Sequence, residues 1–391
     1  METAKYVFLG GGMAAGYAVK EMVEHGGSAN GLIILSSDDA LPYERPPLSK
    51  GLLTGKDKEE SIFINPAGFY REHSIDVQLN TTVTEVDFSS KRIVLGTGEQ
   101  IVFEKLVLAT GAQPRKLDTD GVLYLRSLDD SRRIKDQAAS ARRALVIGGG
   151  FIAMEAASSL AQRGVEVTMA IREDRIWKSF FTEEMSASFQ RYFESRGVRL
   201  ELGADLIRFK QSDYDMVVAG IGVTPVTEIF KGIMLGNGVH VNEYLETSAS
   251  DVYAAGDVAN YHDVLFKKQR RVEHWDNAVS QGKHVAHTLL GERKPFVHVP
   301  YFFSDIFDLS YEFWGDTTGA INTVYRGDVN STSFSAWWLD ETNRLLAAFA
   351  MNRPDEEREA APQWIEHKLN VSPDRLAEGS RALTDALEDR S

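Results

Sequence analysis

Two short glycine-rich stretches of the chain have the residue types and the spacing that hold a nucleotide pyrophosphate. Both follow the pattern GxGxxA, and its fixed positions are Gly10, Gly12 and Ala15 in the first stretch and Gly148, Gly150 and Ala153 in the second. The first glycine permits a tight turn, the second lets the backbone approach the phosphates, and the third small residue lets helix and strand pack closely. The phosphates then lie at a helix N-terminus, where free N–H groups and the helix dipole favour negative charge.

An acidic residue after the following strand completes such a site, because its carboxylate holds the ribose hydroxyls. Asp38 stands there after the first turn. After the second turn, the strand is followed by Arg172 and Glu173. Glu173 would bind ribose hydroxyls and favour NADH, whereas Arg172 would meet a 2′-phosphate and favour NADPH. The sequence leaves both cofactors open and favours NADH.

The segments around both turns are predicted to form βαβ units. The expected strand, helix and strand cover 6–9, 14–25 and 32–35 in the first unit, and 144–147, 152–162 and 165–171 in the second. The apolar runs at 106–110 and 216–222 are typical of buried strands in parallel sheets. From about Phe296 an aromatic-rich stretch predicts antiparallel strands, with a charged helix from Asp355. The predicted fold class is α/β, with two doubly wound, Rossmann-like domains and a C-terminal α+β domain.

The composition excludes several classes of protein and site. The absence of cysteine excludes disulfides, zinc–thiolate sites, iron–sulfur ligation and a redox-active CxxC pair. The formal net charge of -14 argues against a nucleic-acid partner, because a phosphate backbone needs a basic surface. With no apolar run of roughly 18 residues and no signal-peptide pattern, we expect a cytoplasmic protein without membrane insertion. His284 and His287 lie at i, i+3 on a predicted helix, but no third ligand is evident, so no metal site is expected.

Five further motifs stand in a fixed order along the chain. They are YERPPLSK (43–50), LVLATGAQP (106–114), YLRSLDD (124–130), VYAAGDVA (252–259) and RRVEHWDNAVSQG (270–282). With the two glycine turns, they make the whole chain resemble the FAD-dependent pyridine nucleotide reductases of the ferredoxin reductase, monodehydroascorbate reductase and apoptosis-inducing factor group. PYFFSDIFDLSYEFWGD (300–316) most resembles the C-terminal domain of monodehydroascorbate reductases.

This resemblance implies a glutathione reductase-like fold and assigns FAD to the first turn and NADH or NADPH to the second. The implied domains are an FAD domain at 1–118 and 245–295, an NAD(P)H domain at 119–244 and a reductase-type C-terminal domain at 296–391. Asp257 would hydrogen-bond the FAD ribitol chain, and Arg45 and Arg126 would border flavin phosphate and ring oxygens. The other cofactor-binding residues implied are Val83, Thr110, Gly111, Gly222, Glu273, His274, Trp275 and Phe303.

Lys50 and Glu155 are the pair that we expect to act in the chemistry. In similar proteins these two residue types form an ion pair beside flavin N5, where they could orient the nicotinamide and stabilise reduced flavin. Hydride transfer itself is the work of the cofactors, so neither residue is assigned as a general acid or base. Trp275 could stack on a flavin or nicotinamide plane, and Glu273 could bind the nicotinamide amide.

Three acceptors of the electrons are considered. The C-terminal resemblance favours a small radical such as monodehydroascorbate, or a quinone, although Val279 and Phe303 replace an arginine and a tyrosine of the plant enzymes. A basic stretch could instead attract an acidic ferredoxin, and its members are Lys267, Lys268, Arg270 and Arg271. A slow NADH-responsive sensor resembling apoptosis-inducing factor is the third possibility. We expect a monomer or homodimer.

Overall fold

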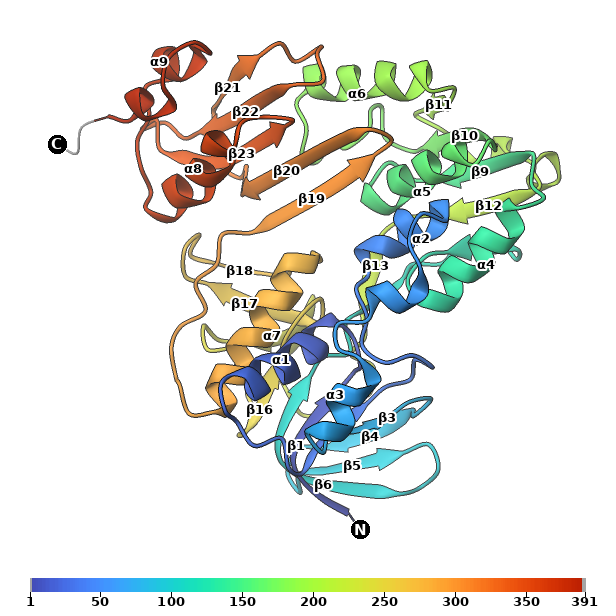
Figure 1. Ribbon diagram of the computed structural model, residues 1–391, viewed down its shortest axis with the longest axis vertical. Helices are drawn as coiled ribbons and strands as arrows, with labels where there is room; N and C mark the ends of the chain where they lie inside the picture. The colour runs from blue at the N-terminus through green and yellow to red at the C-terminus, as the bar shows by residue number, and fades with distance from the viewer. Residues whose placement is uncertain (1, 389–391) are drawn as a thin grey trace. The chain divides into compact units, whose positions relative to one another are not determined.

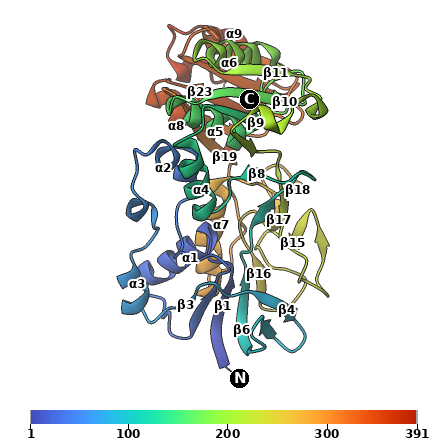
Figure 2. The same cartoon turned by 90° about the vertical axis from the view of Figure 1, so that its right-hand side faces the viewer.

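The computed structural model describes residues 2–388, and the chain divides into two compact units (Figures 1 and 2). Of the described residues, unit 1 contains 2–47, 57–113 and 223–298, and unit 2 contains 48–56, 114–222 and 299–388. Each unit is therefore assembled from three separate stretches of chain. The nine residues 48–56 belong to unit 2, although the sequence on both sides of them belongs to unit 1.

Unit 1 is built on a sheet in the order β3-β2-β1-β6-β5-β4, in which β16 also pairs with β6. Its strands are β1 (Glu2–Leu9), β2 (Leu32–Leu35), β3 (Asp76–Gln78), β4 (Val83–Asp87), β5 (Arg92–Leu95), β6 (Gln100–Leu108) and β16 (Val252–Ala254). The pairs among β1, β2, β3, β6 and β16 are parallel, and β4 and β5 add an antiparallel edge. The carboxyl ends of the parallel strands thus meet at one edge, where open α/β sheets bind ligands.

Helices α1 (Met13–Glu24) and α7 (Trp275–Leu289) pack side by side in unit 1 (Figure 1). Gly282 permits this close approach, because a Cβ there would lie 2.3 Å from the Ala14 carbonyl oxygen. The remaining elements of unit 1 are α3 (Ala67–Glu72), the paired strands β7 (Ala112–Pro114) and β13 (Val223–Pro225), and a second sheet of β14 (Leu235–Gly236), β15 (Gly238–Val241), β17 (Ala259–Asp263) and β18 (Lys268–Arg270).

Unit 2 contains a second parallel sheet, in the order β11-β10-β9-β12-β8. Its strands are β8 (Val122–Tyr124), β9 (Arg143–Ile147), β10 (Glu166–Ile171), β11 (Arg199–Leu202) and β12 (Met216–Ala219). The helices of this part are α2 (Gly51–Thr54), α4 (Leu128–Ala138), α5 (Phe151–Gln162) and α6 (Glu183–Ser195).

The rest of unit 2 is an antiparallel sheet in the order β19-β20-β23-β22-β21. Its elements are β19 (Tyr301–Ile306), β20 (Leu309–Gly315), β21 (Asn322–Gly327), β22 (Phe334–Leu339), β23 (Leu345–Met351), α8 (Asp355–Glu366) and α9 (Pro373–Ala377). Rings on β20 and β23 pack edge to face against rings from the loop between β10 and α6, as in the contacts of Trp177 with Tyr311 and of Phe181 with Phe349. These contacts make one aromatic core within unit 2.

The predicted fold class is confirmed, and the strands and helices predicted for both βαβ units are present. Some bounds were wrong, because β1 begins at Glu2 rather than at residue 6, and β12 ends at Ala219 rather than at residue 222. The first βαβ unit is β1, α1 and β2, and the second is β9, α5 and β10. The aromatic tail forms antiparallel strands, followed by a helix that begins at Asp355. The predicted domain boundaries separate the expected FAD, NAD(P)H and C-terminal parts, whereas the two units above are defined by contacts between residues. The predicted boundaries therefore stay a prediction.

Candidate functional site

The first glycine turn links β1 to α1 and carries two glycines with different requirements. Gly10 has a φ of +116°, and a Cβ on it would lie 2.2 Å from the Ala109 carbonyl oxygen, so only glycine fits. Gly12 has an extended backbone with φ -84° and ψ -165°. Among the described residues, a Cβ added there would have one neighbour within 4 Å, which is Arg45 Nη2 at 3.7 Å. Neither the backbone nor the packing therefore requires glycine at position 12. The open space in front of this helix N-terminus fits a pyrophosphate.

Asp38 follows β2 at the same edge of the sheet as the first turn. Its carboxylate accepts a hydrogen bond from Tyr43 Oη at 2.8 Å and one from the Ala40 N–H at 3.4 Å. These bonds fix the carboxylate in a half-buried position suited to ribose hydroxyls. Val83 lies buried at the start of β4.

The AAGD segment at 254–257 returns the chain to the first turn. A Cβ on Gly256 would lie 3.3 Å from the Ala14 Cβ, so this segment contacts the start of α1. Asp257 is buried there, with 8% of its surface exposed. Thr110 and Gly111 are hydrogen-bonded to Val226. Thr110 Oγ1 donates to the Val226 carbonyl oxygen at 2.8 Å, and the Val226 N–H donates to the Gly111 carbonyl oxygen at 3.0 Å. Unit 1 thus gathers the predicted FAD-binding residues 10, 12, 38 and 257 at one sheet edge.

Glu44 orients Trp275, and sequence reasoning missed this carboxylate. It accepts hydrogen bonds from Tyr17 Oη and from Trp275 Nε1. The rings of Tyr17 and Trp275 meet edge to face, with centroids 6.3 Å apart. Burial raises the pKa of Tyr17 well above its usual range, and the Glu44 carboxylate raises it further. Tyr17 therefore stays a hydrogen-bond donor, and the indole is held in one orientation.

His274, which precedes α7, is kept neutral by its surroundings. Burial lowers its pKa from 6.5 to about 4, a shift that the charges of Asp257 and Asp276 only partly offset. In the unfolded chain this imidazole titrates near pH 6.5, so between about pH 6.5 and 4 the unfolded state binds a proton that the folded state does not. The stability that neutral His274 provides is complete above pH 6.5 and is lost as the pH falls through this window.

Replacing His274 with asparagine is expected to flatten the pH dependence of stability between pH 7 and 5. The wild type should lose about 1 kcal/mol more than the variant over this range, because the partial exposure of the ring reduces the roughly 2 kcal/mol that a fully buried imidazole with these two pKa values would give. Thermal unfolding at pH 7, 6 and 5 measures the difference, with the exposed His262→Asn as the control. Parallel curves for the wild type and His274→Asn would contradict the assignment.

The second glycine turn links β9 to α5 and repeats the geometry of the first. Gly148 has a φ of +123°, and its Cβ would lie 2.3 Å from the Gly220 carbonyl oxygen. Gly150 is extended, with φ -94° and ψ -177°, and a Cβ there would meet no described atom within 4 Å. A Cβ on Gly220 would lie 2.8 Å from the Ala153 backbone nitrogen, so the helix packs closely here. The second turn therefore also has a cradle that a dinucleotide phosphate fits.

Arg172 and Glu173, the two residues predicted to decide between NADH and NADPH, directly follow β10. Arg172 Nη2 lies 2.9 Å from Glu173 Oε1, and the arginine side chain is 87% exposed. Gly222 has a φ of +97° and follows β12. Arg126 precedes α4, where its N–H donates to Asp130 at 3.0 Å.

Glu155 is the centre of a buried cluster in unit 2. It lies on α5 with 6% of its surface exposed, and it accepts hydrogen bonds from Ser49 Oγ on one carboxylate oxygen and from Ser304 Oγ on the other. Lys50 Nζ lies 3.5 Å from Glu155 Oε1 and 3.3 Å from Asp305 Oδ2. The structure thus brings Lys50 and Glu155 together.

Three separate stretches of sequence build this cluster. Ser49 and Lys50 come from the 48–56 segment, Glu155 from α5, and Ser304 from β19. The Lys50 ammonium also lies over the Phe303 ring, 4.4 Å from its centroid. Sequence reasoning missed both serines, because a single serine in a strand or turn carries no periodic signal.

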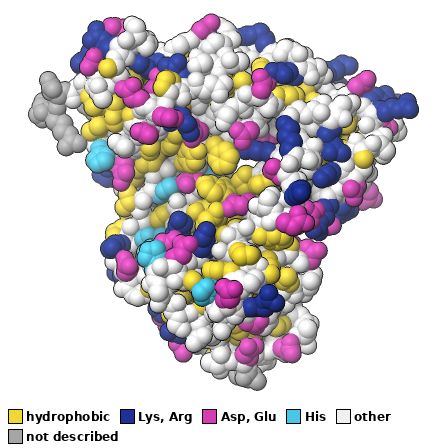
Figure 3. Space-filling model, in the orientation of Figure 1, with side chains coloured by type: hydrophobic (Ala, Val, Ile, Leu, Met, Phe, Trp, Pro, Cys, Tyr) yellow, Lys and Arg dark blue, Asp and Glu magenta, His cyan; other side chains and the backbone are white. Residues whose placement is uncertain are grey.

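The basic stretch at 267–271 is partly neutralised. Arg270 pairs with the buried Asp263 at 2.9 Å, and Arg271 pairs with Glu273 at 2.6 Å. On the face seen in Figure 3, basic and acidic side chains are interspersed. The two arginines therefore add little net positive charge for a protein partner.

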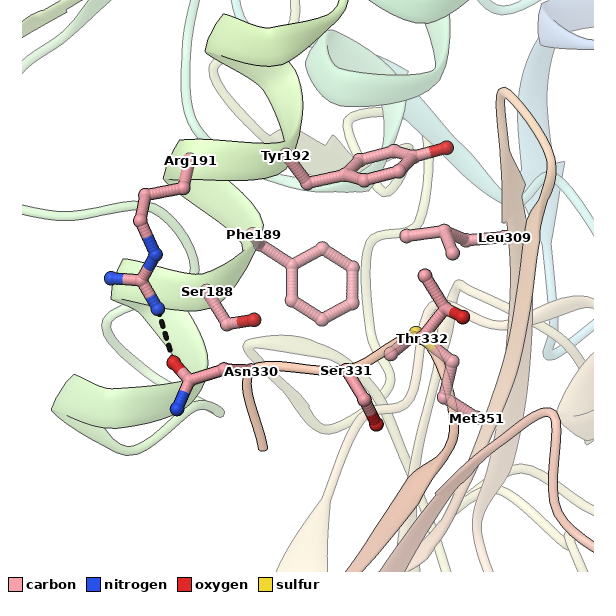
Figure 4. A pocket seen from close by; sticks show the side chains of 9 residues that line it. All are labelled: Ser188, Phe189, Arg191, Tyr192, Leu309, Asn330, Ser331, Thr332 and Met351. Atoms are coloured by element: carbon pink, nitrogen blue, oxygen red, sulfur yellow. Dashed lines mark hydrogen bonds between the residues drawn. The ribbon is translucent and has the colours of Figure 1, made fainter. Parts of the chain in front are cut away.

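A surface pocket of about 210 Å³ lies elsewhere in unit 2, between α6 and the antiparallel sheet (Figure 4). Its lining is Ser188, Phe189, Arg191, Tyr192, Leu309, Asn330, Ser331, Thr332 and Met351. Arg191 is hydrogen-bonded to Asn330 across it. None of the predicted site residues lines this pocket, so it is not the candidate site.

No helix within residues 2–388 is long and apolar enough to cross a membrane.

Comparison with protein families matches residues 4–282 to the pyridine nucleotide-disulphide oxidoreductase model and residues 301–387 to the reductase C-terminal model.

Similar proteins cover almost the whole chain. Monodehydroascorbate reductase 4, peroxisomal, of Arabidopsis thaliana is 34% identical over 94% of this chain and 83% of its own. Monodehydroascorbate reductase of Solanum lycopersicum is 30% identical over 96% of both chains.

Among solved structures, putidaredoxin reductase in its covalent complex with putidaredoxin has a TM-score of 0.92 at 27% identity, covering 99% of this chain and 98% of its own. A ferredoxin reductase of Rhodopseudomonas palustris has a TM-score of 0.90 at 30% identity, covering 99% and 100%.

Proposed function

Since this chain belongs to the pyridine nucleotide-disulphide oxidoreductase family, we propose that it passes electrons to a small one-electron oxidant of the monodehydroascorbate class. It is an NAD(P)H-dependent FAD oxidoreductase that works without redox-active cysteines. The observation that carries the choice of acceptor is the 34% identity to a monodehydroascorbate reductase over 94% of the chain. The neutralised arginines 270 and 271 support it, because they weaken the basic stretch.

The residues of unit 1 fit FAD. The open N-terminus of α1 behind Gly12 would bind the pyrophosphate, and Asp38 the adenosine ribose. Asp257 would accept hydrogen bonds from the ribitol hydroxyls, and Glu44 would keep Trp275 in one orientation. Bound FAD would supply the redox chemistry, which is hydride acceptance from a reduced nicotinamide and electron release to the acceptor, while these residues hold it in place.

The residues of unit 2 fit NADH. The open N-terminus of α5 behind Gly150 would bind the pyrophosphate. Glu155, on the second turn of the same helix, would accept a hydrogen bond from the nicotinamide carboxamide and so orient the ring. Ser49 and Ser304 hold the carboxylate in place, and Lys50 supplies the compensating positive charge.

Glu173 is expected to make the enzyme prefer NADH. A carboxylate binds two ribose hydroxyls and repels a 2′-phosphate, whereas Arg172 is 87% exposed and already paired with Glu173. Glu173→Gln should lower kcat/KM for NADH about tenfold, because hydrogen bonds to a charged group contribute about 1.5–3 kcal/mol. Steady-state kinetics with NADH and NADPH measure the ratio, and Arg172→Ala should change it little. A wild-type preference for NADPH that Arg172→Ala abolishes would reverse the assignment.

The acceptor can be identified by mixing NADH-reduced protein with candidate oxidants in a stopped-flow instrument. Monodehydroascorbate generated by ascorbate oxidase should reoxidise it fastest, ahead of a quinone and of a ferredoxin. Reoxidation by monodehydroascorbate no faster than by air would refute this acceptor. Rapid turnover with any of these acceptors would exclude a slow NADH-responsive sensor.

A ferredoxin-like protein is the second candidate acceptor. The TM-score of 0.92 to putidaredoxin reductase in complex with its putidaredoxin favours it. Replacing Lys267 and Lys268 together with glutamine should then slow ferredoxin reduction and weaken its dependence on salt, while leaving monodehydroascorbate reduction unchanged.

The cytoplasmic location and a monomeric or homodimeric state stay predictions from the sequence. Some relatives are named as peroxisomal, so the location has to be found by fractionating the source cells. Light scattering on the purified holoenzyme gives the oligomeric state.

A further inference from the structure

Three groups that can ligate a metal meet where α1 and α7 end. Glu21 and His25 lie at i and i+4 on α1 and its C-cap, and His287 lies near the end of α7. Gly282 contacts Ala14, and His287 contacts Glu21, so the two helices run in the same direction. Two helix C-termini therefore converge on this point, and their dipoles favour a cation there.

The spacing of these groups suits a tetrahedral cation. His287 Nε2 lies 3.1 Å from Glu21 Oε1, and His25 Nδ1 lies 3.4 Å from the same oxygen. The ligand atoms of all three residues lie within 4.8 Å of one another. Zinc bonds of about 2.0–2.1 Å in tetrahedral geometry place neighbouring ligand atoms about 3.3–3.5 Å apart. The two distances to Glu21 Oε1 are already close to this spacing, and the two imidazole nitrogens have to reach it from at most 4.8 Å.

The second nitrogen of His287 gives an independent indication. His287 Nδ1 lies 3.2 Å from Glu292 Oε1. A carboxylate on the far nitrogen of a metal-bound imidazole fixes its tautomer and leaves Nε2 free to ligate. Glu21 is buried, while the His25 side chain is 48% exposed, so a cation can enter from solvent.

We propose that Glu21, His25 and His287 bind one Zn²⁺-class divalent cation, with water as the fourth ligand. Two imidazoles and a carboxylate are the donor set that such cations prefer. Two contacts compete with it, because Lys283 Nζ lies 3.6 Å from Glu21 Oε2 and His25 Nδ1 lies 3.0 Å from the Glu21 carbonyl oxygen. Binding would cross-link α1, which begins at the first glycine turn, to α7, which follows Glu273 and His274.

Titration with Co²⁺ tests this proposal on untagged holoenzyme that has been stripped with a chelator. We expect one equivalent to bind, with the ligand-field absorption of a tetrahedral site, and Zn²⁺ to displace it. His25→Ala and His287→Ala should each weaken binding at least tenfold, and Glu292→Gln about tenfold. Lys283→Met should tighten it.

His367→Ala is the matched control, because His367 also caps a helix and contacts the carbonyl four residues earlier, at 2.8 Å. It should bind Co²⁺ as the wild type does. Zn²⁺ should also raise the thermal midpoint of the wild type and of His367→Ala, but not of His25→Ala. No Co²⁺ binding, or equal binding by His25→Ala and the wild type, would overturn the proposal. Since His25 is exposed, its replacement should leave the fold intact.

Discussion

Replacing Glu155 with glutamine is expected to slow the reduction of bound FAD by NADH about 100-fold while FAD stays bound. A misplacement of about 1 Å in a reacting group costs a factor of this size. Glutamine keeps the shape of the side chain but removes the charge beside Lys50. It also replaces one of the two oxygens that accept from Ser49 and Ser304 with an NH2 group, which can only donate. Anaerobic stopped-flow mixing with NADH, followed at the flavin absorbance, measures the rate.

Comparing Glu155→Ala with Glu155→Gln separates the effect of losing the carboxylate charge from the effect of losing the packing of the side chain. Glu155→Ala leaves two buried hydroxyls without their shared acceptor, while Lys50 keeps Asp305 as its partner. This variant should therefore also destabilise unit 2 by about 1–3 kcal/mol. Glu155→Gln should lose less stability and retain most of the kinetic defect. Glu166→Gln, an exposed glutamate on β10, is the control for charge alone. Reduction by NADH at the wild-type rate in Glu155→Gln would show that the cluster is structural only.

The serines give a graded version of the same test. Ser304→Ala should slow reduction less than Glu155→Gln, because one of the two hydroxyl donors remains. Ser186→Ala is the matched control, since Ser186 is also buried in unit 2 but donates to the Ile176 carbonyl at 2.8 Å. If both serine variants slowed reduction equally, the effect would not come from Glu155.

The elements and turns were predictable because their signals are local. A GxGxxA pattern between an apolar run and a helical period specifies its own strand, turn and helix within some thirty residues. Asp38 was predictable for the same reason, since its position depends only on the end of the next strand. The pairing of Lys50 with Glu155 came from a family resemblance, because no local pattern joins residues so far apart.

The missed residues are partners from distant parts of the chain. Glu44 meets Tyr17 from 27 residues away and Trp275 from 231 away. Ser304 meets Glu155 across 149 residues, and His287 meets Glu21 across 266. Within their own segments, Glu44, Ser304 and Glu21 follow no pattern that marks them as functional. Their roles follow from tertiary packing, which composition and periodicity do not encode.

Gly150→Ala is expected to weaken NADH binding strongly while the protein keeps its FAD. Gly12→Ala is expected to weaken FAD binding while the NADH site stays intact. Both positions have extended backbones that alanine adopts freely, and a Cβ at either meets no close described neighbour. The methyl group would instead occupy the space in which a pyrophosphate approaches the turn. We expect at least a tenfold loss of affinity in each case, measured by NADH titration and by the FAD content of the purified protein.

The second glycine of each turn is the informative one, because the first cannot be tested cleanly. Alanine at Gly10 or Gly148 would force a Cβ to within 2.2 or 2.3 Å of a carbonyl oxygen at a φ above +110°, so the fold itself would suffer. At Gly12 and Gly150 the cost to the protein is only that of alanine at a helix N-cap, about 1 kcal/mol. A loss of binding free energy larger than this would therefore come from the methyl group blocking the ligand, not from a less stable helix. Should Gly150→Ala lose FAD and Gly12→Ala keep it, the two cofactors would have to be exchanged between the turns.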